Sequence, residues 1–219
     1  MDYRTLGELR SVLLARLGMG AMGASGGANK ALIDSFLYEA QKALYWMQDW
    51  KRLTWYEDKT TGVGQNLYDY PTDCVQDQRI IRVEVLHAGE WRKLSEGITT
   101  GMWSTMESRS FPQRFERHEQ VLVYPESDAA YTLRFWYVKD LGPFAADNDP
   151  CTLDDSMVLT HALAHAKAHY RQPDAQLYQA ALETLLSRIR SQSFSTDGVV
   201  RRSDRSNPEP RPAVVGRDV

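Results

Sequence analysis

Three histidines at four-residue spacing are the residues of this sequence that most suggest a chemical site. His161, His165 and His169 follow one another on a predicted helix, and two imidazoles at i and i+4 can hold one metal ion. A catalytic metal centre also needs further ligands and an acid or base, and none stands at the expected spacing. With Leu159 at the centre of the apolar stripe, a helical wheel places His165 and His169 on its flank and His161 near the polar side. We therefore expect flank or interface histidines, with a metal-dependent enzyme as the competing hypothesis.

Other catalytic constellations are weak in this sequence. Asp154 and Asp155 stand where they can cap a helix, which explains this acidic pair without a catalytic role. Asp147 and Asp149 lack the second acidic cluster of a calcium loop. No serine lies in a Gly-x-Ser-x-Gly elbow, and neither cysteine has a Cys-x-x-Cys partner. The sequence thus predicts no catalytic residue, no cofactor and no metal.

Aromatic residues are abundant, with six tryptophans and eleven tyrosines. Trp46, Trp50, Trp55 and Tyr56 gather where a predicted long helix is followed by the first predicted strand. Rings interleaved with basic residues could stack on nucleic-acid bases, but acidic neighbours balance the basic residues of this segment. Because large rings supply contact area in cores and interfaces, we expect these four residues in a core or at a subunit interface.

Charge and apolar content exclude several classes of protein. The 219 residues include 26 basic and 29 acidic side chains, a formal net charge of -3, whereas proteins that grip nucleic acid usually show a basic excess. No run approaches the ~20 apolar residues of a membrane-spanning helix, and the first residues lack the apolar core of a signal peptide. Cys74 and Cys151 cannot form a disulfide framework, so we expect intracellular synthesis with both thiols reduced.

Apolar periodicity predicts helices at both ends of the chain. Leucines at three- and four-residue steps predict a helix over Thr5–Leu17, and a broader stripe predicts one over Asn29–Lys51 with Asn29 as its cap. Five glycines within residues 18–27 predict a flexible connector between these helices. After Pro150 two more helices follow, and the short turn at Gln172-Pro173-Asp174 predicts an antiparallel hairpin. The last helix is expected to bury an apolar side formed by Leu177, Ala181, Leu182, Leu185 and Ile189.

The middle of the chain has the texture of strands, because runs of aromatic and β-branched residues alternate with polar ones. In the last run, Tyr131, Leu133, Phe135 and Tyr137 share one face. Residues 95–108 are expected to form a short helix or a long loop. The pattern predicts an antiparallel sheet or small sandwich with strands near residues 53–60, 65–70, 79–87, 90–94, 113–117, 120–124 and 130–138.

These elements predict an α+β fold. The N-terminal helices, within residues 1–52, and a C-terminal hairpin over residues 141–194 are expected to bury their apolar faces against each other in one bundle. An antiparallel β domain over residues 53–140 is inserted between them. Residues 195–219 contain three prolines and no aromatic residue, which predicts an extended tail that orders only on a partner. The arginines of this tail are Arg201, Arg202, Arg205, Arg211 and Arg217.

Six motifs follow one another through the middle region and lead into the closing helical hairpin. They are Asn66-Leu67-Tyr68-Asp69-Tyr70-Pro71-Thr72-Asp73, Ile80-Ile81-Arg82-Val83-Glu84-Val85, Trp91-Arg92-Lys93-Leu94, Phe111-Pro112-Gln113-Arg114-Phe115, Val121-Leu122-Val123-Tyr124-Pro125 and the strand from Tyr131 to Tyr137. Their order resembles that of the head-to-tail adaptor (connector) proteins of tailed bacteriophages, the podovirus tail-tubular and tail-accessory type, over about residues 29–190.

The resemblance implies a structural protein without catalysis. Members of this group form a ring, typically of twelve subunits, beneath the portal vertex after DNA packaging. The ring prolongs the channel through which genomic DNA passes without specific binding, and it offers a platform for tail or nozzle proteins. The resemblance also implies that the arginine-bearing tail docks on the portal, and it places the protein in the virion neck, away from any membrane. A different neck component, such as a stopper or tail terminator, is the nearest alternative.

Overall fold

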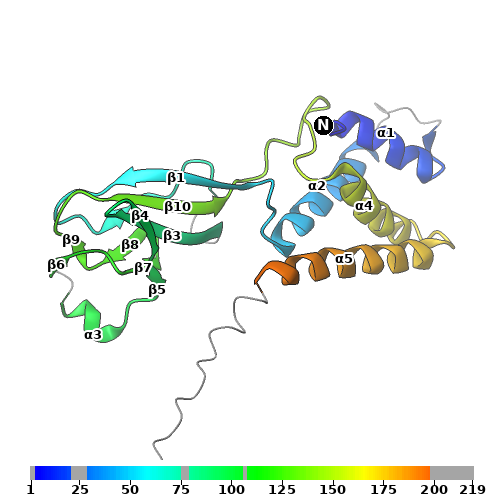
Figure 1. Ribbon diagram of the computed structural model, residues 1–219. Helices are drawn as coiled ribbons and strands as arrows, with labels where there is room; N and C mark the ends of the chain where they lie inside the picture. The colour runs from blue at the N-terminus through cyan, green and yellow to red at the C-terminus, as the bar shows by residue number, and fades with distance from the viewer. Residues whose placement is uncertain (1–2, 21–28, 75–78, 106–107, 198–219) are drawn as a thin grey trace, which may run out of the picture.

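The computed structural model describes residues 3–20, 29–74, 79–105 and 108–197. Two bodies make up the molecule: helices from both ends of the chain form a helical body, and the strands between them form a β body (Figure 1). None of the helices in the described part of the chain is long and apolar enough to cross a membrane. The helical body consists of α1 (Leu6–Arg16), α2 (Lys30–Met47), α4 (Asp155–His169) and α5 (Ala175–Asp197).

Side-chain caps begin two of these helices. At α1 the hydroxyl of Thr5 accepts a hydrogen bond from the Glu8 amide at 3.3 Å while the Glu8 carboxylate accepts one from the Thr5 amide at 2.9 Å, which makes a capping box. At α4 Asp154 accepts from two backbone amides, as predicted. The prediction that Asn29 caps α2 is wrong, because its backbone is already helical and its side chain forms no cap bond. Helix α2 also ends at Met47, before the predicted Lys51.

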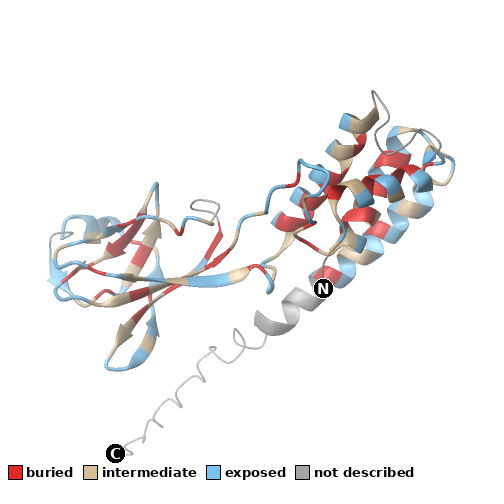
Figure 2. Cartoon of the chain, turned by 90° about the horizontal axis from the view of Figure 1, so that it is seen from above, coloured by how far each residue is buried: buried red, intermediate tan, exposed pale blue. Residues whose placement is uncertain are grey.

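The four helices bury their apolar faces against one another, as predicted. The leucines of α1 pack with Ile33, Leu37 and Leu44 of α2 and with Leu159 and Leu163 of α4 in one cluster. Figure 2 shows these buried residues along the facing sides of the helices. This cluster closes only when both ends of the chain are present.

A fully buried arginine fastens α1 to the rest of the helical body. Arg10 donates to both carboxylate oxygens of Asp34, at 2.5 and 3.0 Å, and to Asp147 at 2.9 Å. Lys30 donates to the same oxygen of Asp147 at 3.0 Å. Removing a charge from water is costly unless it is paired and hydrogen-bonded, and the two carboxylates bind Nε and Nη2 of Arg10, whereas its Nη1 has no hydrogen-bond partner among the described residues. One side chain therefore joins α1, α2 and the segment that enters α4.

A buried amide forms a second polar link. Gln41 of α2 is 1% exposed, and its side-chain oxygen accepts from the Cys151 thiol at 3.1 Å and from the Thr152 amide at 3.0 Å. Burial raises the pKa of the Cys151 thiol to about 12, so this thiol stays protonated and continues to donate.

Helix α5 corrects one expectation. Leu182 and Ile189 are buried as predicted, but Leu177 is 71% exposed and Ala181 is exposed. The buried stripe instead passes through Tyr178, which packs against the helical core. Helix α5 packs mainly on α4, and a single supporting helix covers a narrower stripe than the broad side that the sequence suggested.

The β body is built from two facing sheets of four strands and a separate two-stranded pair. The first sheet has the order β1-β10-β3-β4 and is antiparallel throughout, and the second has the order β2-β8-β7-β5. Two short parallel pairings, β5 with β7 and β6 with β9, were not predicted. The elements are β1 (Thr54–Thr60), β2 (Leu67–Tyr68), β3 (Ile80–His87), β4 (Glu90–Lys93), β5 (Ser95–Glu96), α3 (Thr100–Trp103), β6 (Arg109–Ser110), β7 (Arg114–Arg117), β8 (Val121–Tyr124), β9 (Glu126–Ser127) and β10 (Thr132–Val138).

The two four-stranded sheets enclose a core of their own. Leu133, Phe135 and Tyr137 of β10 point inward and are at most 2% exposed, as the alternation predicted. They meet Phe115 and Val123 of the second sheet. The expected small sandwich is confirmed. Residues 95–108, predicted as a short helix or long loop, contain both β5 and the short helix α3.

The predicted division into domains remains a prediction, although every strand lies within the proposed insertion at 53–140. At the other end, α5 continues to Asp197, three residues past the predicted boundary at residue 194. Residues 21–27 of the predicted connector lie outside the described residues. So do the tail arginines Arg201, Arg202, Arg205, Arg211 and Arg217.

We predict that Asp147→Asn lowers the melting temperature at neutral pH, because buried Arg10 loses a charged partner. Hydrogen bonds from Arg10 and then from Lys30 lower the pKa of Asp147 from 3.8 to about 2. A carboxylate whose pKa is lower in the folded state than in the unfolded state stabilises the fold at pH values above its unfolded-state pKa. This stabilisation is lost as the pH falls through the folded-state pKa. The difference in melting temperature between the wild type and the variant should therefore shrink from pH 4 to pH 2.

Thermal unfolding followed by circular dichroism across this pH range measures the effect. Glu39→Gln, on the exposed side of α2, is the control. A difference between wild type and Asp147→Asn that stayed constant down to pH 2 would contradict the prediction.

Candidate interaction surface

The two bodies are joined where β1 and β10 enter the helical core (Figure 1). Leu53 precedes β1 and Val138 ends β10, and both are buried in the helical cluster. The Lys139 amide donates to the Leu53 carbonyl at 2.8 Å, so the two chain crossings are hydrogen-bonded to each other. Nearby, the hydroxyl of Tyr137 donates to Asp73. The joint is thus a paired, hydrogen-bonded connection.

Arg79 adds a third link across this joint. It precedes β3, is 7% exposed, and donates to the carbonyls of Gln48 at 2.9 Å and Tyr45 at 3.2 Å at the end of α2. Its guanidinium carbon lies 4.5 Å from the centroid of the Tyr45 ring and 5.4 Å from that of Trp46. The last turn of α2 contains no basic residue, and a cation there complements the helix dipole. Arg79 supplies that cation from the β body.

The four aromatic residues that the sequence singled out have different surroundings. Trp46 is 42% exposed and contacts the ring of Tyr45. Trp50 packs against the helical core and donates its indole N–H to the Leu44 carbonyl at 3.0 Å. The rings of Trp55 and Tyr56 are nearly parallel, with centroids 6.1 Å apart, and both are exposed. Trp50 therefore serves the core, while the other three present ring surface to solvent.

Tyr56 belongs to a larger surface, the outer face of the first sheet, which we call the aromatic face. It consists of Tyr56, Trp91 and Trp136 with the cations Arg82 and Arg134. The Arg134 guanidinium lies between two rings, 4.1 Å from the Tyr56 centroid and 3.9 Å from the Trp91 centroid, and the Arg82 guanidinium lies 4.6 Å from the Trp136 centroid. Cation–π contacts of this kind hold both partners in place.

Carboxylates lock these cations into position. Asp58 accepts two hydrogen bonds of 2.7 Å from Arg134, and Glu84 accepts one of 2.7 Å from the Trp136 indole. Glu84 also lies 3.1 Å from Arg82. The aromatic face is therefore preorganised, and its composition of tyrosine, tryptophan and arginine is typical of residues that dominate binding energy at protein interfaces.

Sequence reasoning missed most of this face. It used the alternation from Tyr131 to Tyr137 to find the buried side of the strand. The intervening residues, Arg134 and Trp136, lie on the outer side of the same strand. Their residue types and their two-residue spacing could have indicated this face from the sequence. Arg82 and Trp91, in contrast, join it only through strand pairing.

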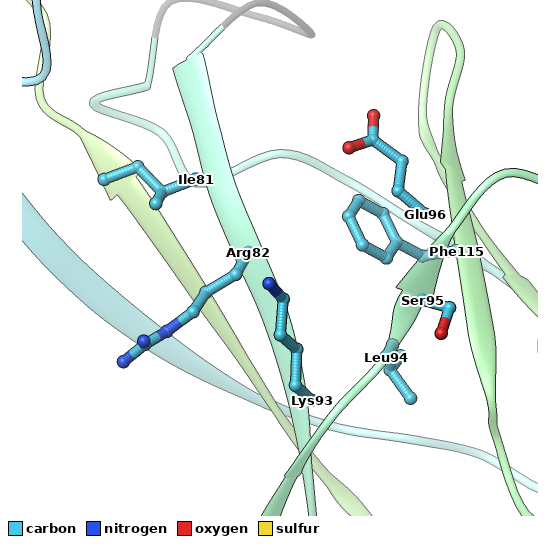
Figure 3. A pocket seen from close by; sticks show the side chains of 7 residues that line it. All are labelled: Ile81, Arg82, Lys93, Leu94, Ser95, Glu96 and Phe115. Carbon is cyan, nitrogen blue, oxygen red and sulfur yellow. The ribbon is translucent and has the colours of Figure 1, made fainter. Parts of the chain in front are cut away.

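A pocket of about 370 Å³ opens beside the end of β4, between β3 and the second sheet (Figure 3). Its lining is mixed: Leu94, Phe115 and Ile81 are apolar, whereas Arg82, Lys93, Ser95 and Glu96 are polar or charged. Ile81 is 39% exposed because the β3–β10 pairing shifts there and leaves it without a partner in the register. The pocket therefore combines apolar and charged groups at the edge of the first sheet.

The three histidines of α4 form no metal site in the described part of the chain. The rings of His161 and His165 stack with centroids 4.6 Å apart, and His169 contacts the ring of Phe36. The helical wheel placed them wrongly, because His161 is half-buried while His165 and His169 are exposed. Burial, reinforced by His165, lowers the pKa of His161 to about 4. The described residues contain no group of three or more metal-ligating side chains suitable for a metal ion.

The described chain thus combines helices from its two ends, packed together in one body, with an inserted β body whose first sheet carries the aromatic face. A family model described as SU10 adaptor protein matches residues 4–209. The chain therefore belongs to the SU10 adaptor protein family, a family of phage head-to-tail adaptors. A comparison with curated proteins found no match. Because the family is structural, it confirms the predicted resemblance and the prediction of a protein that is not an enzyme, and the metal-dependent enzyme is excluded.

We predict that Arg79→Ala destabilises the protein by about 1–3 kcal/mol, because it leaves two partly buried carbonyls of α2 without their donor. Urea unfolding followed by tryptophan fluorescence measures the loss. The matched control is Arg92→Ala at an exposed position of β4, where a change within about 0.5 kcal/mol is expected. Equal free energies of unfolding for the two variants would show that Arg79 contributes nothing special to the joint.

Proposed function

We propose that this adaptor forms a ring, typically of twelve copies, beneath the portal of a tailed phage. The ring prolongs the DNA channel and carries tail or nozzle proteins on its far side. The observation that supports this function most strongly is the family match over residues 4–209, because the adaptor role implies the portal and the tail as partners. Ring closure, copy number and the lining of the channel are parts of the proposal.

The architecture suits a ring subunit. A closed ring of identical copies needs two different patches on each copy, one for each neighbour. The helical body and the β body provide separate surfaces, and the paired crossings at the joint together with Arg79 hold them in a fixed relation. We propose Trp46, Trp55 and Tyr56 as contact residues between copies, with half-buried Trp50 contributing its exposed edge.

The charge balance suits a channel through which DNA slides. Each phosphate contact by lysine or arginine releases a counterion and adds affinity, and strong affinity would oppose movement. The chain carries a net charge of -3. Genomic DNA is therefore proposed to pass the ring without specific binding.

The segment after α5 is proposed to dock on the portal. It contains five arginines and three prolines, and a segment of this composition can wrap a partner's surface when it orders on binding. Arg201, Arg202, Arg205, Arg211 and Arg217 would face acidic groups of the portal.

Electron microscopy of the virion neck tests the ring. We expect a closed ring of this chain between the portal and the tail, with its end segment directed toward the portal. Absence of the chain from purified virions would defeat the proposal. A ring at the far end of the neck would favour the alternative, a stopper or tail terminator.

Removing residues 198–219 tests the docking segment. Because α5 ends at Asp197 and the described cores lie before that point, we expect an unchanged melting temperature and loss of attachment to portal-bearing capsids. A full-length control in which serines replace the five arginines should also fail to attach. Normal attachment of the truncated chain, measured by co-sedimentation, would refute the docking role.

A further inference from the structure

Strand β1 forms an open edge of the first sheet. The Thr61 amide donates to the Tyr131 carbonyl at 2.8 Å, which shows that the backbone groups of Thr61, and of every second residue before it, face β10. In an antiparallel pair, alternate residues direct both backbone groups to the partner strand. The backbone groups of Tyr56, Asp58 and Thr60 therefore point away from β10, and among the described residues no other strand pairs with β1.

Strand β4 forms the opposite edge of the same sheet. The Leu94 amide donates to the Val83 carbonyl at 2.9 Å, so by the same reasoning Trp91 and Lys93 direct their backbone groups outward. Two strands, β10 and β3, lie between these edge strands, and every pairing in the sheet is antiparallel, so β1 and β4 run in opposite directions. When copies are related by rotation about a ring axis, β4 of one copy can meet β1 of the next as an antiparallel pair.

Charge selects one register for such a pair. Consider the register in which Tyr56 of one copy lies opposite Lys93 of the next. Glu57 then lies opposite Arg92, and Lys59 lies opposite Glu90. Both of these pairs join opposite charges. Opposite charges directly across a sheet stabilise the pair, and like charges destabilise it. A register shift of two residues in one direction places Lys59 opposite Arg92, and a shift in the other direction places Glu57 opposite Glu90. Both shifts therefore bring like charges together.

The pocket beside β4 independently favours the same register. With Glu57 opposite Arg92, Trp55 of the neighbouring copy lies opposite Leu94, which lines the pocket (Figure 3). Trp55 is 54% exposed in the single chain and shares the sheet side of Glu57. The exposed indole thus lies beside this pocket, whose mixed lining includes the apolar Leu94 and Phe115, in the register that charge selects.

We infer that the β1 edge of one copy pairs with the β4 edge of the next, so that the first sheets join into one continuous sheet around the ring. The occupant of each edge is a second copy of this chain, and the inference rests on the proposed ring. Charged residues on an exposed edge strand discourage indiscriminate pairing. The charged residues of β1 also complement those of β4 in the neighbouring copy, so the β1 edge accepts this strand and stays protected from others.

Engineered disulfides test the contact directly. In the inferred register Glu57 and Arg92 form a non-hydrogen-bonded pair, whose Cα atoms lie about 4.5 Å apart, within the range that a disulfide spans. We expect the full-length Glu57→Cys/Arg92→Cys variant, assembled on portal-bearing capsids and oxidised, to give a ladder of covalently linked chains up to the closed ring. Reducing agent should collapse the ladder to single chains.

The matched control is Glu57→Cys/Lys93→Cys, because Lys93 lies next to Arg92 but points to the opposite face of the sheet. This control should give no ladder beyond the background of the wild type, which retains its own two cysteines. Equal ladders from both variants would overturn the inferred register.

Charge reversal tests the same pair without a covalent bond. Glu57→Arg alone and Arg92→Glu alone should each raise the concentration needed for half-maximal ring assembly by at least about fivefold. The double reversal should restore it, while the melting temperature of the unassembled chain changes little in all three, because the ion pair that Glu57 forms with Lys59 is partly exposed. No rescue by the double variant would overturn the inference.

The outcomes separate this inference from the proposed function. Rings that form and attach to the portal without the disulfide ladder would refute the sheet contact and leave the adaptor ring intact. Failure of the wild-type chain to form any ring on portal-bearing capsids would refute both. A ladder that ends at the copy number seen by electron microscopy supports both.

Discussion

The relation between the two bodies depends on what crosses the joint. Leu53 and Val138 extend the strands of the β body into the helical core, and the hydrogen bond between Lys139 and Leu53 ties the two crossings together. A single crossing would permit rotation, whereas paired crossings resist it. Arg79 then fixes the end of α2 against the start of β3. For a protein that acts by shape, this relation matters more than any single reactive group.

The sequence predicted helices, strands and their buried sides correctly where contacts between residues close in the sequence determine them. Thr5, the leucines that follow it and Asp154 define helix starts and faces through contacts within a few residues. The alternation from Tyr131 to Tyr137 likewise placed Leu133, Phe135 and Tyr137 in the core. Errors arose where a distant residue decides the outcome. Helix α2 ends beside Arg79, some thirty residues later, and nothing near Met47 in the sequence announces it.

The candidate surface shows the same limit. The sequence identified Trp55 and Tyr56 through their types, and both are exposed. It could not identify the aromatic face, because Arg134 meets Tyr56 and Trp91 only through the pairing of four strands. It expected Trp50 in a core or at a subunit interface without choosing between them, and in the structure the indole N–H of Trp50 donates to the Leu44 carbonyl. Residue type alone does not separate a ring that supports the core from one that meets a partner.

The interrupted helical body has a consequence for synthesis on the ribosome. Helices α1 and α2 are made first, but Leu159 and Leu163, which cover them, follow more than a hundred residues after Leu44. At roughly 5–20 residues per second, the leucines of the first two helices wait for seconds with their covering helix still unmade. The β core, contained between Tyr68 and Tyr137, is complete earlier. The nascent chain therefore exposes the apolar faces of its N-terminal helices for the longest time, and a chaperone would bind there.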